Sequence, residues 1–319
     1  SLVGRERFTN TSDMSEYLEN SGNLEKIRTD RETLTREDEM GEFMFLGLRM
    51  TKGVSKKDFQ EYFGTSIEKI YGEVLEKYNR LVQETAEFMY SFATYDELEG
   101  RYVLKGAIPA QETLRAAETI NPPFELSYWH FAMQTAQQWR ERMGQQRSLE
   151  WDEMIDKLSP LASNNEGLYL AAETAIDTYK DIRYTSDHMA VLGAVGILPM
   201  NKLIREDYMK NTLHWIWDNW NWGKTWGWDY PMTAMNAARL GEPEKAVGAL
   251  LMDKRTNTYL PNGHNYQDGR LRIYLPGNGG LLTAIAMMCA GWDGCTETNP
   301  GFPKDGTWNV RWEGLKPLP

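Results

Sequence analysis

The segment from Trp215 to Trp228, WIWDNWNWGKTWGW, holds six of the twelve tryptophans of this 319-residue chain, and Asp229 follows it directly. Tryptophan is costly to expose, so a dense patch usually fills a core or lines a site that stacks on flat ligands. Here the rings are mixed with Asp, Asn and Lys, which is too polar for a plain core helix. Rings beside carboxylates and amides suit sugars, because rings stack on apolar sugar faces and polar groups bind hydroxyls. The alternative is a helix end packed with aromatic residues.

Two acidic residues near this segment are candidates for acid and base chemistry. Asp229 lies between Trp228 and Tyr230, and Asp187 directly precedes His188. Either could instead cap a helix, because acidic side chains are favoured at helix N-termini. Asp229 is preferred, since more aromatic residues surround it. Glycoside hydrolysis needs two such carboxyl groups, roughly 5–10 Å apart.

A second polar cluster lies in the loop Asn262-Gly263-His264-Asn265. Two amides and an imidazole could bind sugar hydroxyls or a phosphate, or the asparagines could simply stabilise a turn. Asn278 lies in a glycine-rich segment before an apolar helix, a place where an anion can bind. Without the GK[ST] sequence this segment is not a P-loop.

The composition excludes several classes of protein. A net charge of −11 argues against nucleic acid binding, which needs a basic surface. No apolar stretch approaches the roughly twenty residues of a membrane helix, and the first ten residues lack the apolar core of a signal peptide. Cys289 and Cys295 lack metal-site spacing. We expect a soluble protein of the bacterial cytoplasm or periplasm, with a carbohydrate partner, no metal and no cofactor; its oligomeric state is open.

The spacing of apolar residues predicts a mainly helical chain. Thr35, Ser55 and Ser66 are good N-caps, and Gly64 ends a helix that begins after Ser55. This order of short helices resembles a winged-helix domain. Further helices are expected at about 83–93, 124–143, 149–158, 186–197, 201–219, 230–240, 243–252 and 279–290. Strands are expected at 101–104, 169–171 and 271–275.

Two segments of the chain carry different family resemblances. Residues 4–81, with LTREDEMGEFMFLGLRMTKGVSKKDFQEYFG and SIEKIYGEVLEKYNRL, resemble the C-terminal domain of oxygen-independent coproporphyrinogen oxidase and its radical-SAM relatives. The cluster motif CxxxCxxC of that family is absent, so the resemblance implies an accessory domain alone. We therefore expect one domain at 1–81 and a second at 82–319.

Residues 82–319 resemble the C-terminal part of an α/α-toroid glycoside hydrolase related to family 65, through RYVLKGAIPAQET, NPPFELSYW and TWGWDYPMTAMNAARLG. The family has an acidic loop whose Glu is the general acid, and IPAQET takes its place here. The resemblance thus implies Glu112 as the acid and matches Asn121 to a family Asn; Gln111 and Thr113 depart from the pattern. The expected substrate-binding residues are Asn121, Trp129, Asp187, His188, Trp222, Trp226, Trp228, Asn262, His264, Asn265 and Asn278.

The predicted fold is mainly α: an incomplete α/α toroid of the six-hairpin type after a small winged-helix-like domain. A closed toroid needs more helix pairs than the sequence predicts, which suggests a fused or truncated chain. The expected function is an inverting glycosidase for a neutral oligosaccharide, with Glu112 and Asp229 as acid and base, or a glycoside phosphorylase. It would be inactive if the toroid stays open. The alternatives are a non-catalytic carbohydrate-binding or interaction module and an accessory domain of a haem-biosynthesis enzyme.

Overall fold

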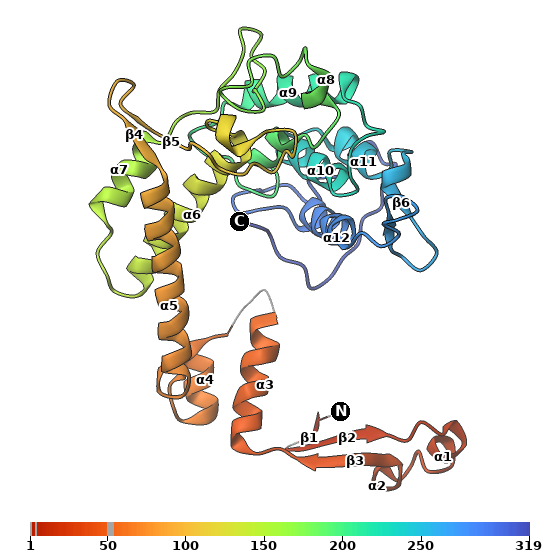
Figure 1. Ribbon diagram of the computed structural model, residues 1–319. Helices are drawn as coiled ribbons and strands as arrows, with labels where there is room; N and C mark the ends of the chain where they lie inside the picture. Colours follow the sequence, from red (N-terminus) through yellow and green to blue (C-terminus); the bar gives the residue numbers. More distant parts are fainter. Residues whose placement is uncertain (1, 4, 50–53) are drawn as a thin grey trace. The chain divides into compact units, whose positions relative to one another are not determined.

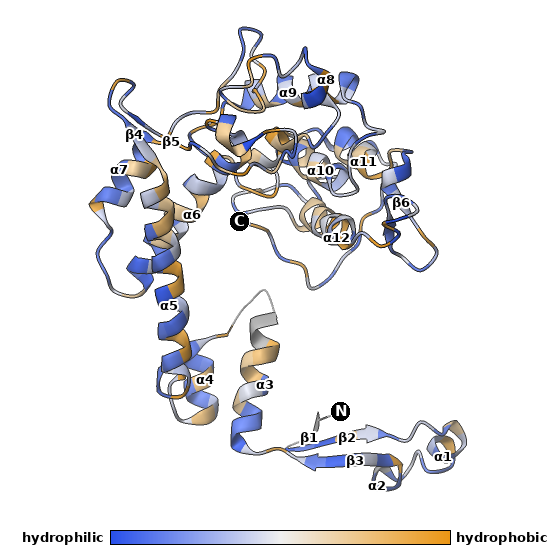
Figure 2. Ribbon diagram, in the orientation of Figure 1, coloured by the Kyte–Doolittle hydropathy of each residue, from blue (hydrophilic) through white to orange (hydrophobic). Residues whose placement is uncertain are grey.

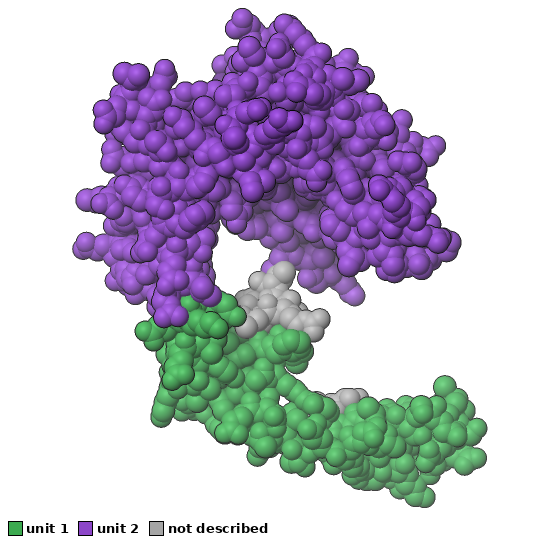
Figure 3. Space-filling model, in the orientation of Figure 1, with its two compact units in different colours: residues 1–78 green, residues 79–319 purple. Residues whose placement is uncertain are grey.

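The computed structural model describes residues 2–3, 5–49 and 54–319. It divides into two compact units, unit 1 at residues 1–78 and unit 2 at residues 79–319 (Figure 3). The described residues form twelve α-helices and a few short strands, so the prediction of a mainly helical chain is confirmed (Figure 1). No helix in these ranges is long and apolar enough to cross a membrane.

Unit 1 begins with a sheet that the sequence analysis did not predict. The strands β1 (Leu2–Val3), β2 (Glu6–Asn10) and β3 (Arg28–Thr33) pair antiparallel in that order. Two short helices, α1 (Met14–Glu19) and α2 (Leu24–Ile27), lie between β2 and β3 in the chain. Most side chains of β2 and β3 are exposed or half-buried, so these strands lack the alternation of apolar residues that announces a strand.

Three helices complete this part of the chain: α3 (Arg36–Arg49), α4 (Lys56–Phe63) and α5 (Ile67–Phe92). Their starts follow the predicted caps, because Ser55 Oγ accepts from Asp58 N at 3.1 Å and Ser66 Oγ from Lys69 N at 3.2 Å. Gly64 ends α4 with φ of 63°, a left-handed conformation that glycine adopts freely. The winged-helix arrangement stays a prediction. The small core of this unit consists of Met40, Phe59, Phe63 and Ile67.

Unit 2 holds the larger core and the remaining helices. After the hairpin of β4 (Thr94–Asp96) and β5 (Arg101–Val103), its elements are η1 (Ala116–Glu118), α6 (Pro123–Arg142), α7 (Leu149–Lys157), α8 (Ile182–Thr185), η2 (Ala190–Ala194), α9 (Glu206–Asn219), α10 (Asp229–Arg239), α11 (Pro243–Leu250), η3 (Arg255–Asn257), β6 (Thr258–Tyr259), β7 (Asn265–Tyr266) and α12 (Leu275–Ala290).

Helix α10 is the centre of unit 2. Every residue from Asp229 to Ala238 is buried, and α10 packs against α11, α12 and η2. Helix α12 carries no charged residue and is coloured largely apolar in Figure 2. A helix buried as completely as α10 needs apolar residues on more than one face, whereas α12 leaves Leu275 and Leu282 exposed. The loops at the N-terminal ends of α10 and α12 are thereby fixed on a rigid base.

The expected helix at 186–197 is wrong: the chain forms turns and the 3₁₀-helix η2 there. The reason is close packing, since a Cβ at Gly196, which has φ of 137°, would lie 2.9 Å from Asn236 N. Tyr169 makes only an isolated bridge to Ser163, and in the described chain residues 271–274 are irregular and α12 begins at Leu275. The strand at 101–103 and most of the other expected helices are present.

The loop before α10 depends on a glycine at position 227. A Cβ there would lie 1.9 Å from Asn265 Oδ1, and Gly227 N donates to Gln267 Oε1 at 3.0 Å. We expect Gly227→Ala to lower the free energy of unfolding by about 1–3 kcal/mol, because the loop or Asn265 must shift. Urea unfolding followed by circular dichroism measures the change.

The matched control is Gly223→Ala in the same loop, where the nearest atom to a new Cβ is Asn221 Oδ1 at 3.7 Å. It should change the stability by less than about 0.5 kcal/mol. Equal effects of the two substitutions would show that the close approach at position 227 does not matter.

Candidate functional site

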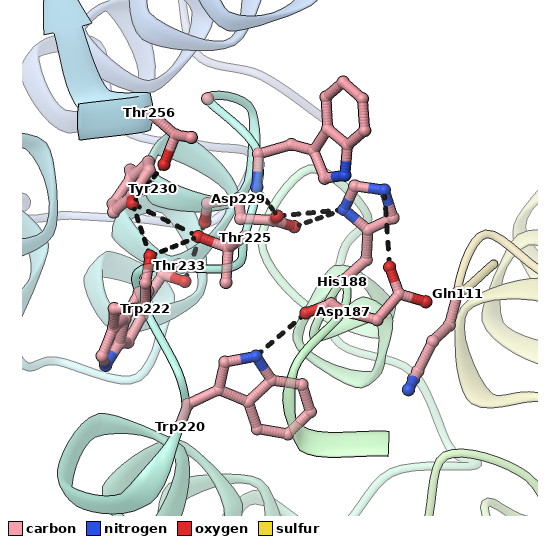
Figure 4. A network of polar contacts seen from close by, with 12 residues as sticks. Gln111, Asp187, His188, Trp220, Trp222, Thr225, Asp229, Tyr230, Thr233 and Thr256 are labelled. Atoms are coloured by element: carbon pink, nitrogen blue, oxygen red, sulfur yellow. Dashed lines mark hydrogen bonds and ion pairs between the residues drawn. The ribbon is translucent and has the colours of Figure 1, made fainter. Parts of the chain in front are cut away.

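A buried carboxylate–imidazole pair lies at the start of α10 (Figure 4). Asp229 is fully buried, and its Oδ2 lies 2.9 Å from Nδ1 of His188. The same oxygen accepts from the backbone N–H of Trp226 at 2.8 Å. Because an ionised carboxylate only accepts, the hydrogen bond assigns the proton to Nδ1 and leaves Nε2 of His188 facing away from α10.

The electrostatics of this pair favour retention of a proton. Burial raises the pKa of Asp229, against the hydrogen bond and charge of His188. Burial would lower the pKa of His188, but the hydrogen bond and charge of Asp229, with the charges of Asp187 and Glu112, outweigh it and raise that pKa. His188 therefore keeps its second proton, and with it the positive charge of the imidazolium, to a higher pH than a free imidazole does.

Two further carboxylates lie on the other side of His188. Asp187 Oδ1 lies 3.9 Å from Nε2 of His188, and Asp187 Oδ2 accepts from the backbone N–H of Thr113 at 2.8 Å. One carboxylate oxygen each of Glu112 and Asp187 and one ring nitrogen of His188 all lie within 4.8 Å of one another. The structure thus brings the predicted residues Glu112, Asp187, His188 and Asp229 to one place.

The loop that carries Glu112 is fixed after this residue by the bond of Thr113 N to Asp187, and before it by two further bonds. Ala110 N donates to Glu125 Oε1 at 2.7 Å, and Gln111 Nε2 donates to the backbone oxygen of Tyr184 at 2.9 Å. With its neighbours fixed, the Glu112 side chain is exposed at the site. Sequence reasoning missed Glu125, a buried acid whose pKa is raised by burial. Its one signal was an acidic residue in the first turn of α6, directly after two prolines and a phenylalanine.

Three aromatic rings surround the polar groups. The ring of Trp228 lies 4.7 Å from that of His188, and the ring of Trp226 lies 6.0 Å from His188 and 5.5 Å from Tyr274. All three aromatic side chains are half-buried. Burial and then the charges of Asp229 and Glu112 raise the pKa of Tyr274, so its phenol lies within the field of both carboxylates. The sequence analysis did not single out Tyr274.

Three predicted sugar-binding residues lie in the core or against it. Trp222 is buried, with its ring 5.8 Å from that of Tyr230 and its Nε1 donating to a backbone oxygen. Trp129 Nε1 likewise donates to the backbone oxygen of Met89. The side chain of buried Asn121, which has φ of 52°, accepts from Leu104 N and donates to Glu173. Their polar groups are already satisfied, which argues against their predicted role.

The asparagine-rich loop matches the alternative of a stabilised turn. Asn262 Oδ1 accepts from His264 N at 3.2 Å, and Asn278 binds the backbone of Asn265 and Gly263. Asn265 is fully buried, and its Nδ2 donates to the backbone oxygens of Thr256 and Thr258. This cluster packs against Gly227, in the loop that carries Trp226 and Trp228.

The group of Glu112, Asp187 and His188 has the donor types that hold a divalent cation. Asp229 on Nδ1 would then orient the imidazole, as carboxylates commonly do beside metal-bound histidines. The sequence analysis predicts no metal, because the two cysteines lack the spacing of a metal site and the histidines are far apart in the sequence. Glu112 cannot hold a cation and carry a transferable proton at the same time, so the two uses of this group exclude each other.

Comparison with known proteins gives separate results for the two parts of the chain. Residues 34–81 match the HemN C-terminal domain. A stretch of 73 residues is 36% identical to "Heme chaperone HemW" of Bacillus subtilis (strain 168), which is 23% of this chain and 19% of that protein. Among solved structures, "Putative kojibiose phosphorylase from human microbiome" is similar, with a TM-score of 0.47 and 11% identity, over 80% of this chain and 39% of that chain.

The chain therefore spans less than half the length of either of these proteins. The resemblance of the N-terminal part is confirmed at residues 34–81, and a structural similarity to a phosphorylase is found over most of the chain. Over residues 34–81 the chain is thus similar to the HemN C-terminal domain.

Proposed function

We propose that unit 2 cleaves a glycosidic bond, with Glu112 as the proton donor and the Asp229–His188 pair as the proton acceptor. The observation that carries this proposal is the position of the exposed Glu112 carboxyl group beside an imidazole whose other nitrogen is bound by a buried carboxylate. An exposed acid and an oriented base at one site are the two groups that inversion at a sugar carbon requires. Since they lie within 4.8 Å of each other, the exposed Glu112 side chain must swing away from His188 on substrate binding to give the roughly 6.5–9.5 Å that the sugar and a water need. The family-65-like motifs agree with this reaction and with a partial α/α toroid around the site.

The aromatic side chains support a sugar as the substrate. Trp226, Trp228 and Tyr274 are half-buried and lie around His188, so their ring faces can stack on the apolar face of a pyranose. Asp187 can accept a hydrogen bond from a sugar hydroxyl group. Its Oδ2 is bound by Thr113 N, which leaves Oδ1 for the ligand. No cofactor is needed for this chemistry.

Asp229 acts through His188 in this proposal. Asp229 is fully buried and already accepts two hydrogen bonds, so it has no free access to water. With its proton on Nδ1, His188 can accept a proton from water at Nε2, and Asp229 stabilises the imidazolium that forms. Glu112 gives its proton to the glycosidic oxygen while the bond between that oxygen and the anomeric carbon breaks. The water oxygen bonds to the anomeric carbon from the opposite face.

The first test removes the acid. We expect Glu112→Gln to lower kcat by about 10²–10⁴-fold, because the amide cannot protonate the leaving oxygen. The measurement is release of reducing sugar or glycosyl phosphate from a panel of glycosides, with and without inorganic phosphate, by the full chain. Folding should not change, since the Glu112 side chain is exposed.

The control is Glu118→Gln on η1, an exposed acid in the same segment that lies outside the site. It should leave kcat unchanged. If the wild-type chain binds sugars but shows no Glu112-dependent activity on any glycoside, the carbohydrate-binding module is the better interpretation.

The second test uses pH. Because His188 must be neutral to accept a proton and its pKa is raised, the rate should fall as the pH drops through a value above the usual pKa of about 6.5. In Asp229→Asn the hydrogen-bonding charge is lost and burial prevails, so the pKa of His188 falls. An NMR titration of the His188 ring protons measures this shift. An unchanged pKa in Asp229→Asn would contradict the pairing.

The third test separates acid–base catalysis from metal use. If Glu112 carries a proton, dialysis against EDTA should leave kcat unchanged. If Glu112, Asp187 and His188 instead hold an essential cation, EDTA should abolish activity, and Zn²⁺ or Mn²⁺ should restore it. That second result would remove Glu112 from the role of acid.

A further inference from the structure

An apolar cavity of about 310 Å³ lies in unit 2. Its wall includes Phe124 of α6, Ala190 of η2, Trp228, Met232 of α10 and Gly279 of α12. None of its lining residues, all of which belong to the described part of the chain, is charged. Sulfur, aromatic and small aliphatic groups form a surface that adapts to flat or compact apolar ligands.

The cavity is poorly suited to a sugar. The only hydroxyl group among its lining side chains within the described ranges, that of Thr283, already donates to the backbone oxygen of Gly279 at 2.9 Å. A sugar ring that entered would bury hydroxyl groups without partners, at a cost of roughly 1–3 kcal/mol for each group. An apolar group would instead gain free energy from leaving water.

The cavity adjoins the acid–base site through four segments of the chain. Ala110 and Glu112 lie on the first segment, and His188 and Ala190 lie on the second. On the third and fourth, Trp228 directly precedes Asp229, and Pro276 follows Tyr274 by two residues. Each segment thus gives one residue to the site and one to the cavity wall.

Trp228 belongs to both places, because its ring lies 4.7 Å from that of His188 and also lines the cavity.

We propose that this cavity receives the apolar aglycone of the substrate. The substrate would then be an aryl or compact alkyl glycoside, in place of the oligosaccharide expected from the sequence. This inference rests on the proposed function, because it needs a glycosidic oxygen at Glu112.

The size of the cavity agrees with such a group. A cavity of about 150 Å³ can hold benzene, so about twice that volume accommodates a bicyclic aromatic ring system. In the reaction the bond between the anomeric carbon and the oxygen breaks, and Glu112 supplies the proton. The aglycone leaves as a neutral phenol or alcohol, and water completes the sugar. A neutral leaving group can remain in an apolar cavity.

The experiment measures the binding of 1-naphthol, an aglycone without a sugar, to the full chain by titration calorimetry. Gly279→Leu fills the cavity, since a Cβ at Gly279 has no neighbour within 4 Å. We expect it to weaken naphthol binding by about tenfold or more, because the buried apolar contact is lost. Leu282→Ala, on an exposed position of the same helix, is the control and should bind like the wild type.

A second variant, Ile197→Trp, keeps the test valid if Gly279→Leu does not fold. Ile197 lines the cavity but is 49% exposed, so a larger side chain fits there without disturbing the core. It should also weaken naphthol binding. Undiminished binding in both filled variants, or no naphthol binding to the wild type, overturns the inference.

The outcome separates this inference from the proposed function. Naphthol binding does not require the acid, so Glu112→Gln should bind naphthol normally. Normal binding that the filled variants abolish, without Glu112-dependent cleavage of any glycoside, would retain the cavity as an apolar binding site and reject the catalytic proposal. Glu112-dependent cleavage that favours oligosaccharides over naphthyl glycosides would retain catalysis and reject the aglycone site.

Discussion

The hydrogen bond between Asp229 and His188 is the interaction on which the site depends. A carboxylate that is fully buried is tolerable only with a partner, because removal of one member of a buried pair costs about 3–5 kcal/mol. This requirement fixes His188 against the start of α10. It also fixes the backbone of Trp226, whose N–H is the second donor to Asp229. The positions of Asp187 and Trp228 follow, since each is the chain neighbour of one member of the pair.

The tryptophan-rich segment divides its rings between two tasks. Trp220 and Trp222 are buried, and Trp220 Nε1 donates to the backbone oxygen of Asp187, which fixes the segment that carries His188. Trp226 and Trp228 are half-buried beside the polar groups. The core interpretation therefore holds for Trp220 and Trp222, and the site interpretation stays a prediction for Trp226 and Trp228. The polar residues between the rings mark the turns that separate the two parts.

The sequence predicted the elements whose signals are local. Helices with a capping hydroxyl or a terminal glycine, such as α4 after Ser55, begin and end where expected. The strands β2 and β3 escaped notice because charged and threonine side chains make up most of both strands, and Phe8 is the one buried side chain among the described residues of the two strands. The helix expected at 186–197 failed because close contact with α10 overrides local helical preference.

The candidate site could be predicted only in part. Asp229 and Glu112 were recognisable from aromatic neighbours and from a family motif, but their meeting at His188 is a property of the tertiary structure. Amides such as Asn121 and Asn265 look the same in sequence whether they bind a sugar or a backbone. Here both amides form hydrogen bonds with backbone groups of irregular loops, because a buried N–H or C=O must be paired. Glu125 and Tyr274 gain their roles from burial, which sequence patterns do not reveal.

The long chain separations within the site have a consequence for how the protein folds. Thr113 bonds to Asp187 across 74 residues, and His188 bonds to Asp229 across 41. Such long loops close slowly, because closing them lowers the entropy of the chain before the new contact stabilises it. We therefore expect the site to be among the last features to form. Interactions absent from the folding transition state govern the unfolding rate. We therefore expect the His188–Asp229 bond to affect the lifetime of the native protein more than the rate of its folding.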